Sequence, residues 1–126
     1  SYQAAIAYYA QLDNAVLAVE AQAGLAQVAQ AQGNLAQAQQ WVETLLPILA
    51  EQPHAGFTTP FGTYLTCYRV LAANQDARAA ALIEIAYKLL QEYAASIHDA
   101  PWQKTFLENV SVHRQIQQLY AGNSPA

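Results

Sequence analysis

The chain contains few side chains of the types that perform catalysis or bind metals, and their spacing favours structural roles. The histidines His54, His98 and His113 share no metal-ligand spacing, and no cysteine pair accompanies them. The single cysteine, Cys67, would need a neighbouring base or cation to act as a nucleophile, and Arg69 falls on a different helix face. We therefore expect surface or helix-end histidines and a cysteine packed in the core.

The acidic residues fit solvated helix faces better than a general acid–base pair. A catalytic pair needs two environments that separate the pKa values, and the sequence shows no such arrangement. The acids considered are Glu84, Glu92, Asp99 and Glu108. Glu84 precedes Lys88 by four residues, which is the favourable order for an ion pair along a helix. Gly24 and Gly33 are isolated and form no phosphate-binding loop. The sequence thus predicts a protein that is not an enzyme and needs no cofactor or metal.

Composition indicates a helical protein and argues against nucleic acid and membrane as partners. The chain has 126 residues, of which 27 are Ala and 16 are Gln, and both residue types favour helices. The net charge is −4 with five scattered cations, whereas binding to phosphates needs clustered Lys and Arg. No apolar run or leader pattern indicates a membrane span or signal peptide, and one cysteine fits a reducing compartment. We expect a cytoplasmic protein, and the low charge makes a homo-oligomer plausible.

Apolar residues recur at helical spacing along most of the chain, and the alternating pattern of strands is absent. Turn and capping residues divide this pattern into seven expected helices, with a stop or kink at Pro47 and caps at Asp99 and Ser111. We expect one domain over residues 1–121 and a tail over 122–126, in a chain cut from a longer solenoid. The helices are expected at residues 2–12, 15–32, 35–49, 60–73, 77–97, 101–108 and 112–120.

Residues 23–46 read as two amphipathic helices joined at Gly33, and this arrangement is the unit of a tetratricopeptide repeat. Small residues such as Ala26 and Ala38 fall where the paired helices would cross. The apolar stripe from Leu35 to Leu49 returns 44 residues later from Ala79 to Tyr93. Such units stack on neighbours, so we predict an all-α, right-handed solenoid closed by a C-terminal pair of capping helices.

The segment AGLAQVAQAQGNLAQAQQWVETLL resembles the C-terminal tetratricopeptide regions of large bacterial multi-domain signalling ATPases and transcriptional regulators. The segment YLTCYRVLAANQD resembles the next repeat, and FLENVSVHRQI is similar to the motif that closes these arrays. Two residues depart from the pattern: Gln75 stands where Gly is usual, and Pro47 lies inside a helix. The resemblance implies a scaffold for protein–protein interaction or inducer sensing, without catalytic residues.

By analogy with these repeats, the first helix of each pair lines a groove that binds a partner. The groove residues expected on this basis are Glu20, Gln27, Gln30, Tyr64, Tyr68 and Arg69. Arg69 would then be the cation that holds a partner carboxylate. Tyrosines also pack between helices, so Tyr64 and Tyr68 are compatible with either helix packing or a recognition groove.

Two hypotheses for function follow, and a third is weaker. The first is a non-enzymatic helical-repeat scaffold that binds a protein or peptide segment, or other domains of its own parent chain. The alternative is a ligand-sensing domain with a small-molecule pocket lined by Tyr64, Tyr68 and Trp41 or Trp102. An all-α enzyme is the third. A shallow groove would favour the scaffold, and a deep apolar cavity would favour the ligand sensor.

Overall fold

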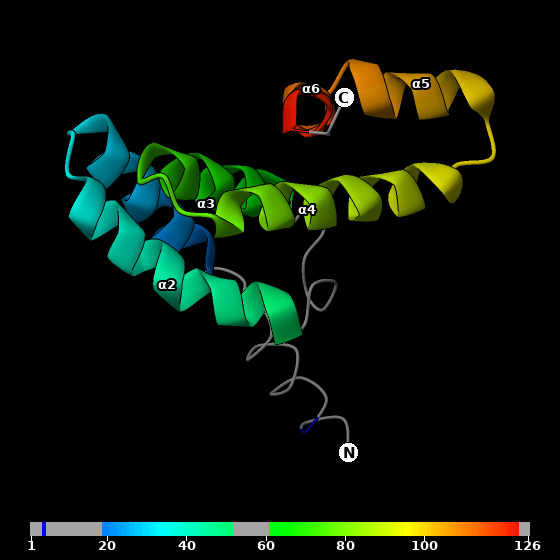
Figure 1. The fold of residues 1–126 in the computed structure, drawn as a ribbon. Coiled ribbons are helices and arrows are strands. Elements are labelled where there is room, and N and C mark those ends of the chain that lie inside the picture. Colours follow the sequence, from blue (N-terminus) through cyan, green and yellow to red (C-terminus); the bar gives the residue numbers. More distant parts are fainter. Residues whose placement is uncertain (1–3, 5–18, 52–60, 124–126) are drawn as a thin grey trace.

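The computed structural model describes Ala4, residues 19–51 and residues 61–123. Every regular element in these residues is an α-helix, which confirms the all-α prediction for the described part (Figure 1). No helix in the same residues combines the length and the apolar character needed to cross a bilayer. Apart from Ala4, the expected helix over residues 2–12 lies outside the described residues, as do His54 and the last three residues of the tail.

The described helices follow the expected order with small changes at their ends. The first covers residues 19–31. The others are α2 (Leu35–Glu51), α3 (Phe61–Ala73), α4 (Arg78–Ala95), α5 (Ala100–Glu108) and α6 (Ser111–Asn123). The last helix therefore extends two residues into the segment expected as a tail.

The helix α3 lies at the centre of the packing. It contacts α2, α4 and α6, and the side chains of Gln27 and Gln30 connect it to the helix over residues 19–31. Eight of its thirteen residues are buried. They are Phe61, Thr63, Tyr64, Leu65, Thr66, Cys67, Val70 and Leu71. Burial on nearly every side means that the neighbouring helices are arranged around α3.

Small side chains sit at the helix crossings, as the sequence predicted. Ala26 and Ala38 both have 0% exposed surface, so the helices that carry them approach closely. Ala86 on α4 is buried to the same extent. The predicted core position of Cys67 is also confirmed, since its side chain is buried inside α3.

The turn before α2 and the turn before α4 share one pattern of backbone hydrogen bonds. Asn34 N–H donates to Ala29 O at 2.9 Å and Gly33 N–H donates to Gln30 O at 3.0 Å, the two bonds of a Schellman motif. The second turn repeats both bonds 42 residues later, with Gln75 and Asp76 in the places of Gly33 and Asn34. Backbone φ is 78° at Gly33 and 57° at Gln75. The left-handed position that the sequence suggested for Gly therefore exists in both turns.

Two local expectations are wrong. The stop expected at Pro47 does not occur, since α2 continues to Glu51, because a proline near a helix end removes only one backbone hydrogen bond; the alternative of a kink stays a prediction. Ser111 is the first residue of α6 rather than its cap, and its hydroxyl accepts a bond from the Gln115 side chain at 2.9 Å. The predicted cap at Asp99 is confirmed, since its carboxylate accepts from Trp102 N–H at 3.0 Å.

The last two helices are joined by polar bonds at the C-terminal end of α5. A helix leaves its last carbonyls without partners, and α6 supplies donors for three of them. His113 Nδ1 lies 2.7 Å from Phe106 O, Gln117 donates to Leu107 O at 2.6 Å, and Arg114 donates to Glu108 O at 3.1 Å. These bonds fix α5 to α6 although α5 itself has no buried residue.

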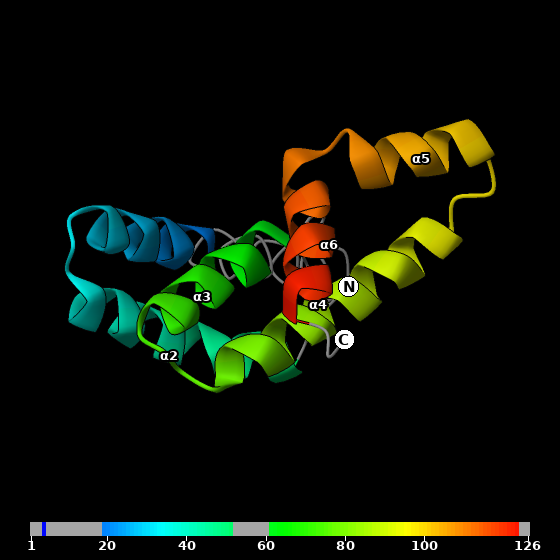
Figure 2. The ribbon, with the colours of Figure 1, turned by 45° about the horizontal axis from the view of Figure 1, so that its top comes forward.

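The helix α6 crosses α3 and α4, whereas α5 runs back from the far end of α4 toward α6. Figure 1 shows α6 nearly end-on while α3 and α4 run across the view, and Figure 2 shows the same crossing after rotation. Ile116 of α6 is fully buried, Tyr87 and Tyr120 stack with ring centroids 3.9 Å apart, and α6 contacts both α3 and α4. The cap expected over α4 is thus formed mainly by α6, and Trp102 of α5 stays 68% exposed.

Replacing Ala38 with leucine should overpack the crossing of α2 with its neighbours. Ala38 has no exposed surface, so the added atoms can be accommodated only by shifting the helices. We expect Ala38→Leu to lower the free energy of unfolding by about 1–3 kcal/mol in urea melts. Ala36→Leu, at an exposed position of the same helix, is the control. Equal stability of the two variants would contradict close packing at Ala38.

Replacing Gln75 with glycine should relieve the left-handed backbone of the second turn. A side chain at positive φ is strained, whereas glycine adopts this conformation readily. We expect Gln75→Gly to raise the free energy of unfolding by about 0.5–1 kcal/mol, and Gly33→Ala to lower it by about 1 kcal/mol. A Cβ added at Gly33 meets no atom within 4 Å, so backbone strain alone would account for that loss. Thermal melts that rank the two variants in the opposite order would refute the common geometry.

Candidate functional site

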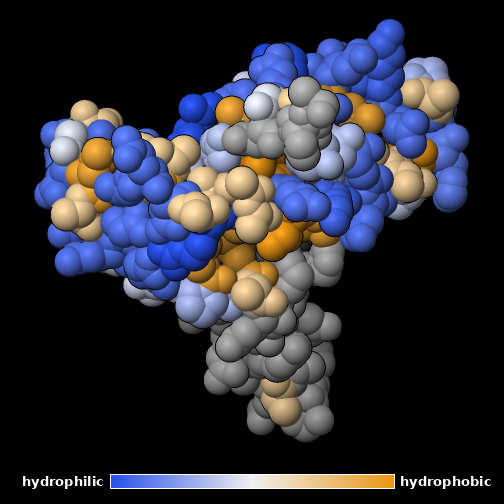
Figure 3. All heavy atoms as spheres, in the orientation of Figure 1, coloured by the Kyte–Doolittle hydropathy of each residue, from blue (hydrophilic) through white to orange (hydrophobic). Residues whose placement is uncertain are grey.

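An apolar hollow between α2 and α4 is the most distinctive surface feature of the described residues. It encloses about 550 Å³, and buried side chains form its floor, among them Tyr64 and Leu71 of α3. Figure 3 shows hydrophobic residues gathered on this face of the molecule. We call it the α2–α4 hollow. Its lining consists of Glu43, Leu46, Pro47, Leu49, Ala50, Tyr64, Leu71, Arg78, Ala81, Leu82 and Ile85.

The walls of the hollow reach solvent. Pro47 and Ala50 of α2 are exposed, as are Ala81 and Ile85 of α4, and Ile85 has 51% of its surface exposed. These four residues line one hollow together, and a contiguous apolar patch of this kind marks an interaction site more often than a single exposed residue does. The volume lies within the range of about 300–1,000 Å³ that is usual for ligand sites. The hollow can therefore accept a few apolar side chains or a small apolar ligand.

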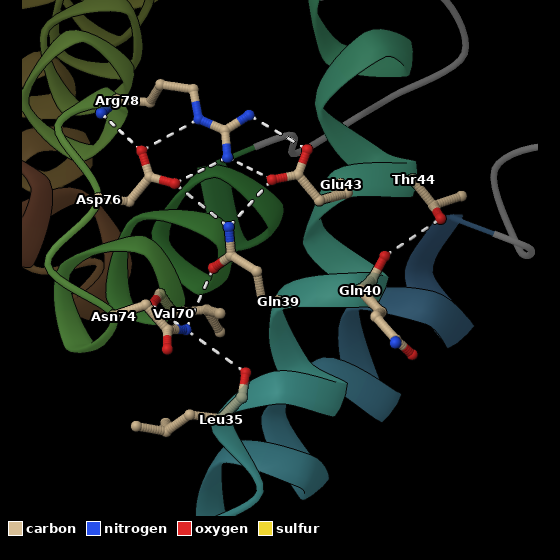
Figure 4. Close-up of polar contacts among 9 residues, drawn as sticks. All are labelled: Leu35, Gln39, Gln40, Glu43, Thr44, Val70, Asn74, Asp76 and Arg78. Carbon is tan, nitrogen blue, oxygen red and sulfur yellow. Dashed lines mark hydrogen bonds and ion pairs between the residues drawn. The ribbon is translucent and has the colours of Figure 1, made fainter.

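A group of polar side chains joins α2 to the turn before α4 at one end of the hollow (Figure 4). Arg78 donates to both oxygens of Glu43 and to both oxygens of Asp76, with 3.1 Å from Nη1 to Glu43 Oε2 and 3.0 Å from Nε to Asp76 Oδ1. Gln39 donates to both carboxylates, and Asn74 donates to the Gln39 side-chain oxygen at 3.1 Å. We call these five residues the polar clamp.

The guanidinium of Arg78 determines the protonation of the polar clamp. Its hydrogen bonds hold the pKa of Asp76 and of Glu43 below their usual values, and the two carboxylates raise the pKa of Arg78. Both carboxylates are therefore ionised at neutral pH and the group carries a net charge of −1. Arg78 and Glu43 are exposed and Asp76 is partly buried, so solvent screens the contribution of the Arg78–Glu43 pair most strongly. Asp76 also pairs with Arg78, two residues further along the chain, with 2.7 Å between Nη2 and Oδ2.

The predicted groove residues Gln27 and Gln30 serve as contacts between helices. Gln27 Nε2 donates to Thr66 Oγ1 at 2.7 Å, and Gln30 Nε2 donates to Arg69 O at 3.3 Å. Both partners lie 39 residues further along the chain, so the helix over residues 19–31 and α3 lie side by side. The side-chain amides of Gln27 and Gln30 therefore donate hydrogen bonds within the fold. Glu20, at the start of the same helix, is exposed.

The aromatic and cationic groove candidates of α3 lie on different sides of that helix. Tyr64 is 1% exposed and belongs to the floor of the α2–α4 hollow. Arg69 lies roughly 140° round the helix from Tyr64, is exposed, and donates to the Gln115 side chain of α6. Tyr68 is half-buried against the core. The structure thus brings Gln30 and Arg69 together but places Tyr64 on another surface.

The residues of the ligand-sensor hypothesis are also separated. Of the proposed lining, only Tyr64 belongs to the hollow, while Tyr68 and Trp41 pack against the core and Trp102 projects from α5. The α2–α4 hollow is therefore lined mainly by residues that the ligand-sensor hypothesis did not name.

Cys67 and His113 take structural positions in the helices. No cluster of three His, Cys, Asp or Glu side chains suitable for a metal ion occurs among the described residues. Burial raises the pKa of the Cys67 thiol to about 12, so the nucleophilic thiolate is scarcely populated at neutral pH. His113 lies in the first turn of α6, so it is a helix-end histidine, but it is buried between the rings of Phe61 and Phe106 and its Nδ1 contacts a backbone carbonyl. His98 is exposed, and the expected pair Glu84–Lys88 is present at 3.0 Å.

Sequence reasoning missed the α2–α4 hollow. Pro47 was interpreted only as a helix breaker, and Ile85 falls outside the predicted inner stripe of α4. An isoleucine beside Ala81 on the otherwise polar side of an amphipathic helix was the available signal. The role of Arg78 could not be predicted from the sequence, because its bonds form only where α2 meets the turn before α4.

Comparison of the chain with protein-family models, with curated proteins and with solved structures finds no match. The site must therefore be interpreted from its own geometry.

The polar clamp should make stability depend on pH. Because the folded-state pKa of Asp76 is lowered, its contribution is present above its unfolded pKa and is lost as the pH falls toward the folded value. We expect Asp76→Asn to be less stable than the wild type at neutral pH, with the difference vanishing in acid. Urea melts over a pH series measure this, and Glu43→Gln should converge in the same way. A difference that stays constant to the acid end of the series would contradict the assignment.

Proposed function

We propose that this chain is a non-enzymatic helical-repeat scaffold that binds a protein segment through the α2–α4 hollow. The observation that carries the proposal is an apolar hollow of about 550 Å³ whose walls leave Ile85, Pro47 and two alanines in solvent. Burial of such surface by a partner is favourable, roughly in proportion to the apolar area covered.

The chemistry of the lining favours a protein segment over a polar small molecule. Pockets for small molecules combine an apolar lining with a few polar groups that converge on the ligand. The charged groups of this lining, Glu43 and Arg78, are bonded to one another, and Tyr64 is in the floor. The remaining lining is aliphatic. A few apolar or aromatic side chains on one face of a peptide match that surface better than a polar metabolite does, because polar partners are confined to one end of the hollow.

The repeat architecture is part of the same proposal. Two turns with the same pair of backbone bonds, and side-chain bonds between helices 39 residues apart, support stacked helix pairs of the tetratricopeptide type. The resemblance of residues 23–46 to bacterial signalling ATPases and regulators is our reason to propose a role in bacterial signalling or transcription regulation, in the cytoplasm. The partner is then a separate protein or another domain of the parent chain.

A peptide-display selection on the immobilised chain tests this function. We expect the enriched peptides to carry large apolar residues and to bind at least tenfold more weakly to Ala81→Glu, which places a carboxylate in the hollow. Ala80→Glu is the matched control, because Ala80 is an exposed neighbour on α4 that does not line the hollow. Circular dichroism would confirm that both variants stay helical.

The same selection separates the competing surfaces. Acidic peptides whose binding is lost in Arg69→Ala but retained in Ala81→Glu would locate recognition at the predicted groove and refute the proposal. Binding of small apolar compounds in the hollow, without any peptide that responds to Ala81→Glu, would favour the ligand-sensor alternative instead.

A further inference from the structure

The α2–α4 hollow combines an apolar floor with two groups that recognise an indole ring. Arg78 and Glu43 both line it, and their side chains keep 50% and 47% of their surface exposed. Arginine stacks on aromatic faces, and a buried tryptophan needs an acceptor for its ring N–H. The hollow thus combines a cation, a carboxylate and an aliphatic floor. This combination suits a tryptophan side chain better than it suits an aliphatic one.

Hydrogen-bond capacity at Glu43 supports this fit. A carboxylate offers about four acceptor positions. Glu43 Oε1 accepts from Gln39 and from Arg78, and Oε2 accepts from Arg78 Nη1 at 3.1 Å. These bonds leave Oε2 with capacity for one more donor. The N–H edges of Arg78 point to Asp76 and Glu43, which orients the guanidinium and leaves its flat face for ring stacking.

The chain itself carries a tryptophan that is suited to this role. It has two tryptophans, of which Trp41 packs against the core while Trp102 is 68% exposed. Trp102 lies in the first turn of α5, a helix with no buried residue that begins just past the end of α4 and runs back toward α6 (Figure 1). An exposed tryptophan offers a large apolar ring and one N–H donor, and tryptophan is among the residues that most often anchor interfaces.

A molecule cannot place Trp102 in its own hollow. The α4 residues of the hollow, from Arg78 to Ile85, lie in the first half of that helix, whereas α5 follows its far end. The helix α5 contacts α4 and α6 but not α2, which forms the other wall. The distance along α4 from Ile85 to its end is about 15 Å at 1.5 Å per residue.

We propose that Trp102 of one copy of this chain occupies the α2–α4 hollow of a second copy. The contact joins two different surfaces, so it is head-to-tail and leaves a free hollow at one end and a free Trp102 at the other. This inference rests on the proposed function of the hollow and names its occupant. Association therefore extends with concentration, into a ring or an open chain.

Sedimentation velocity from micromolar to millimolar concentration tests the contact, with Trp102→Ala and Ala81→Glu as the decisive variants. We expect the average mass of the wild type to rise with concentration. Each variant alone should have an association constant at least tenfold lower than that of the wild type. Mixing the variants should restore a dimer of one copy of each, because one retains the hollow and the other retains the tryptophan. That dimer cannot extend, since its remaining surfaces are both mutated.

Leu25→Ala is the matched control, because Leu25 is an exposed apolar residue on the helix over residues 19–31, away from both surfaces. It should associate as the wild type does, and circular dichroism should show all variants equally helical. A wild type that stays monomeric at millimolar concentration overturns the proposal, as does association that persists in Trp102→Ala or a mixture that does not pair. If any of these occurs while displayed peptides still respond to Ala81→Glu, the head-to-tail contact fails and the function of the hollow stands.

Discussion

The burial of α3 is the constraint on which the rest of the structure depends. Eight of its thirteen residues are inaccessible, so helices must cover it from several directions at once. The buried polar groups on this helix need partners as well. Thr66 donates to Gly62 O at 3.0 Å and accepts from Gln27, so the helix over residues 19–31 supplies a hydrogen bond in addition to apolar cover. The side of α3 that carries Tyr64 and Leu71 is covered less closely, and the α2–α4 hollow opens there.

Polar contacts, rather than additional apolar burial, determine how the two ends of the molecule are attached. At the hollow, the polar clamp ties α2 to the turn that begins α4, although no backbone contact joins these two helices. At the other end, side chains of α6 satisfy the final carbonyls of α5. Both devices act through side-chain donors that reach a neighbouring helix end. The polar clamp thereby links the two walls at one end of the hollow, and the bonds to α6 hold α5 in a position where Trp102 stays exposed.

Sequence reasoning could predict what depends on local spacing. The helical period, the Gly33 turn, the small residues Ala26 and Ala38 and the cap at Asp99 all follow from neighbours within a few residues, and all are present. What depends on the meeting of distant segments could not be predicted. The sequence around Gln27 and Gln30 does not show whether their amides line a groove or contact α3. The bond between Arg78 and Asp76 depends on the geometry of the turn before α4. The crossing of α6, and therefore the exposure of Trp102, depends on packing against α3 and α4 together.

The central position of α3 has a consequence for how the chain is made. Its partners come from both sides of the sequence: residues 19–51 precede it, and α4 and α6 follow it. When α3 leaves the ribosome, Gln27 and α2 are already available, but the surface that α6 covers stays open until the whole of α4 and α5 has been synthesised. Partly covered apolar helices are prone to misassociation during this interval. The segment most important for the finished fold is thus also the one that a nascent chain leaves incompletely covered for longest, and it is there that a chaperone would have surface to bind.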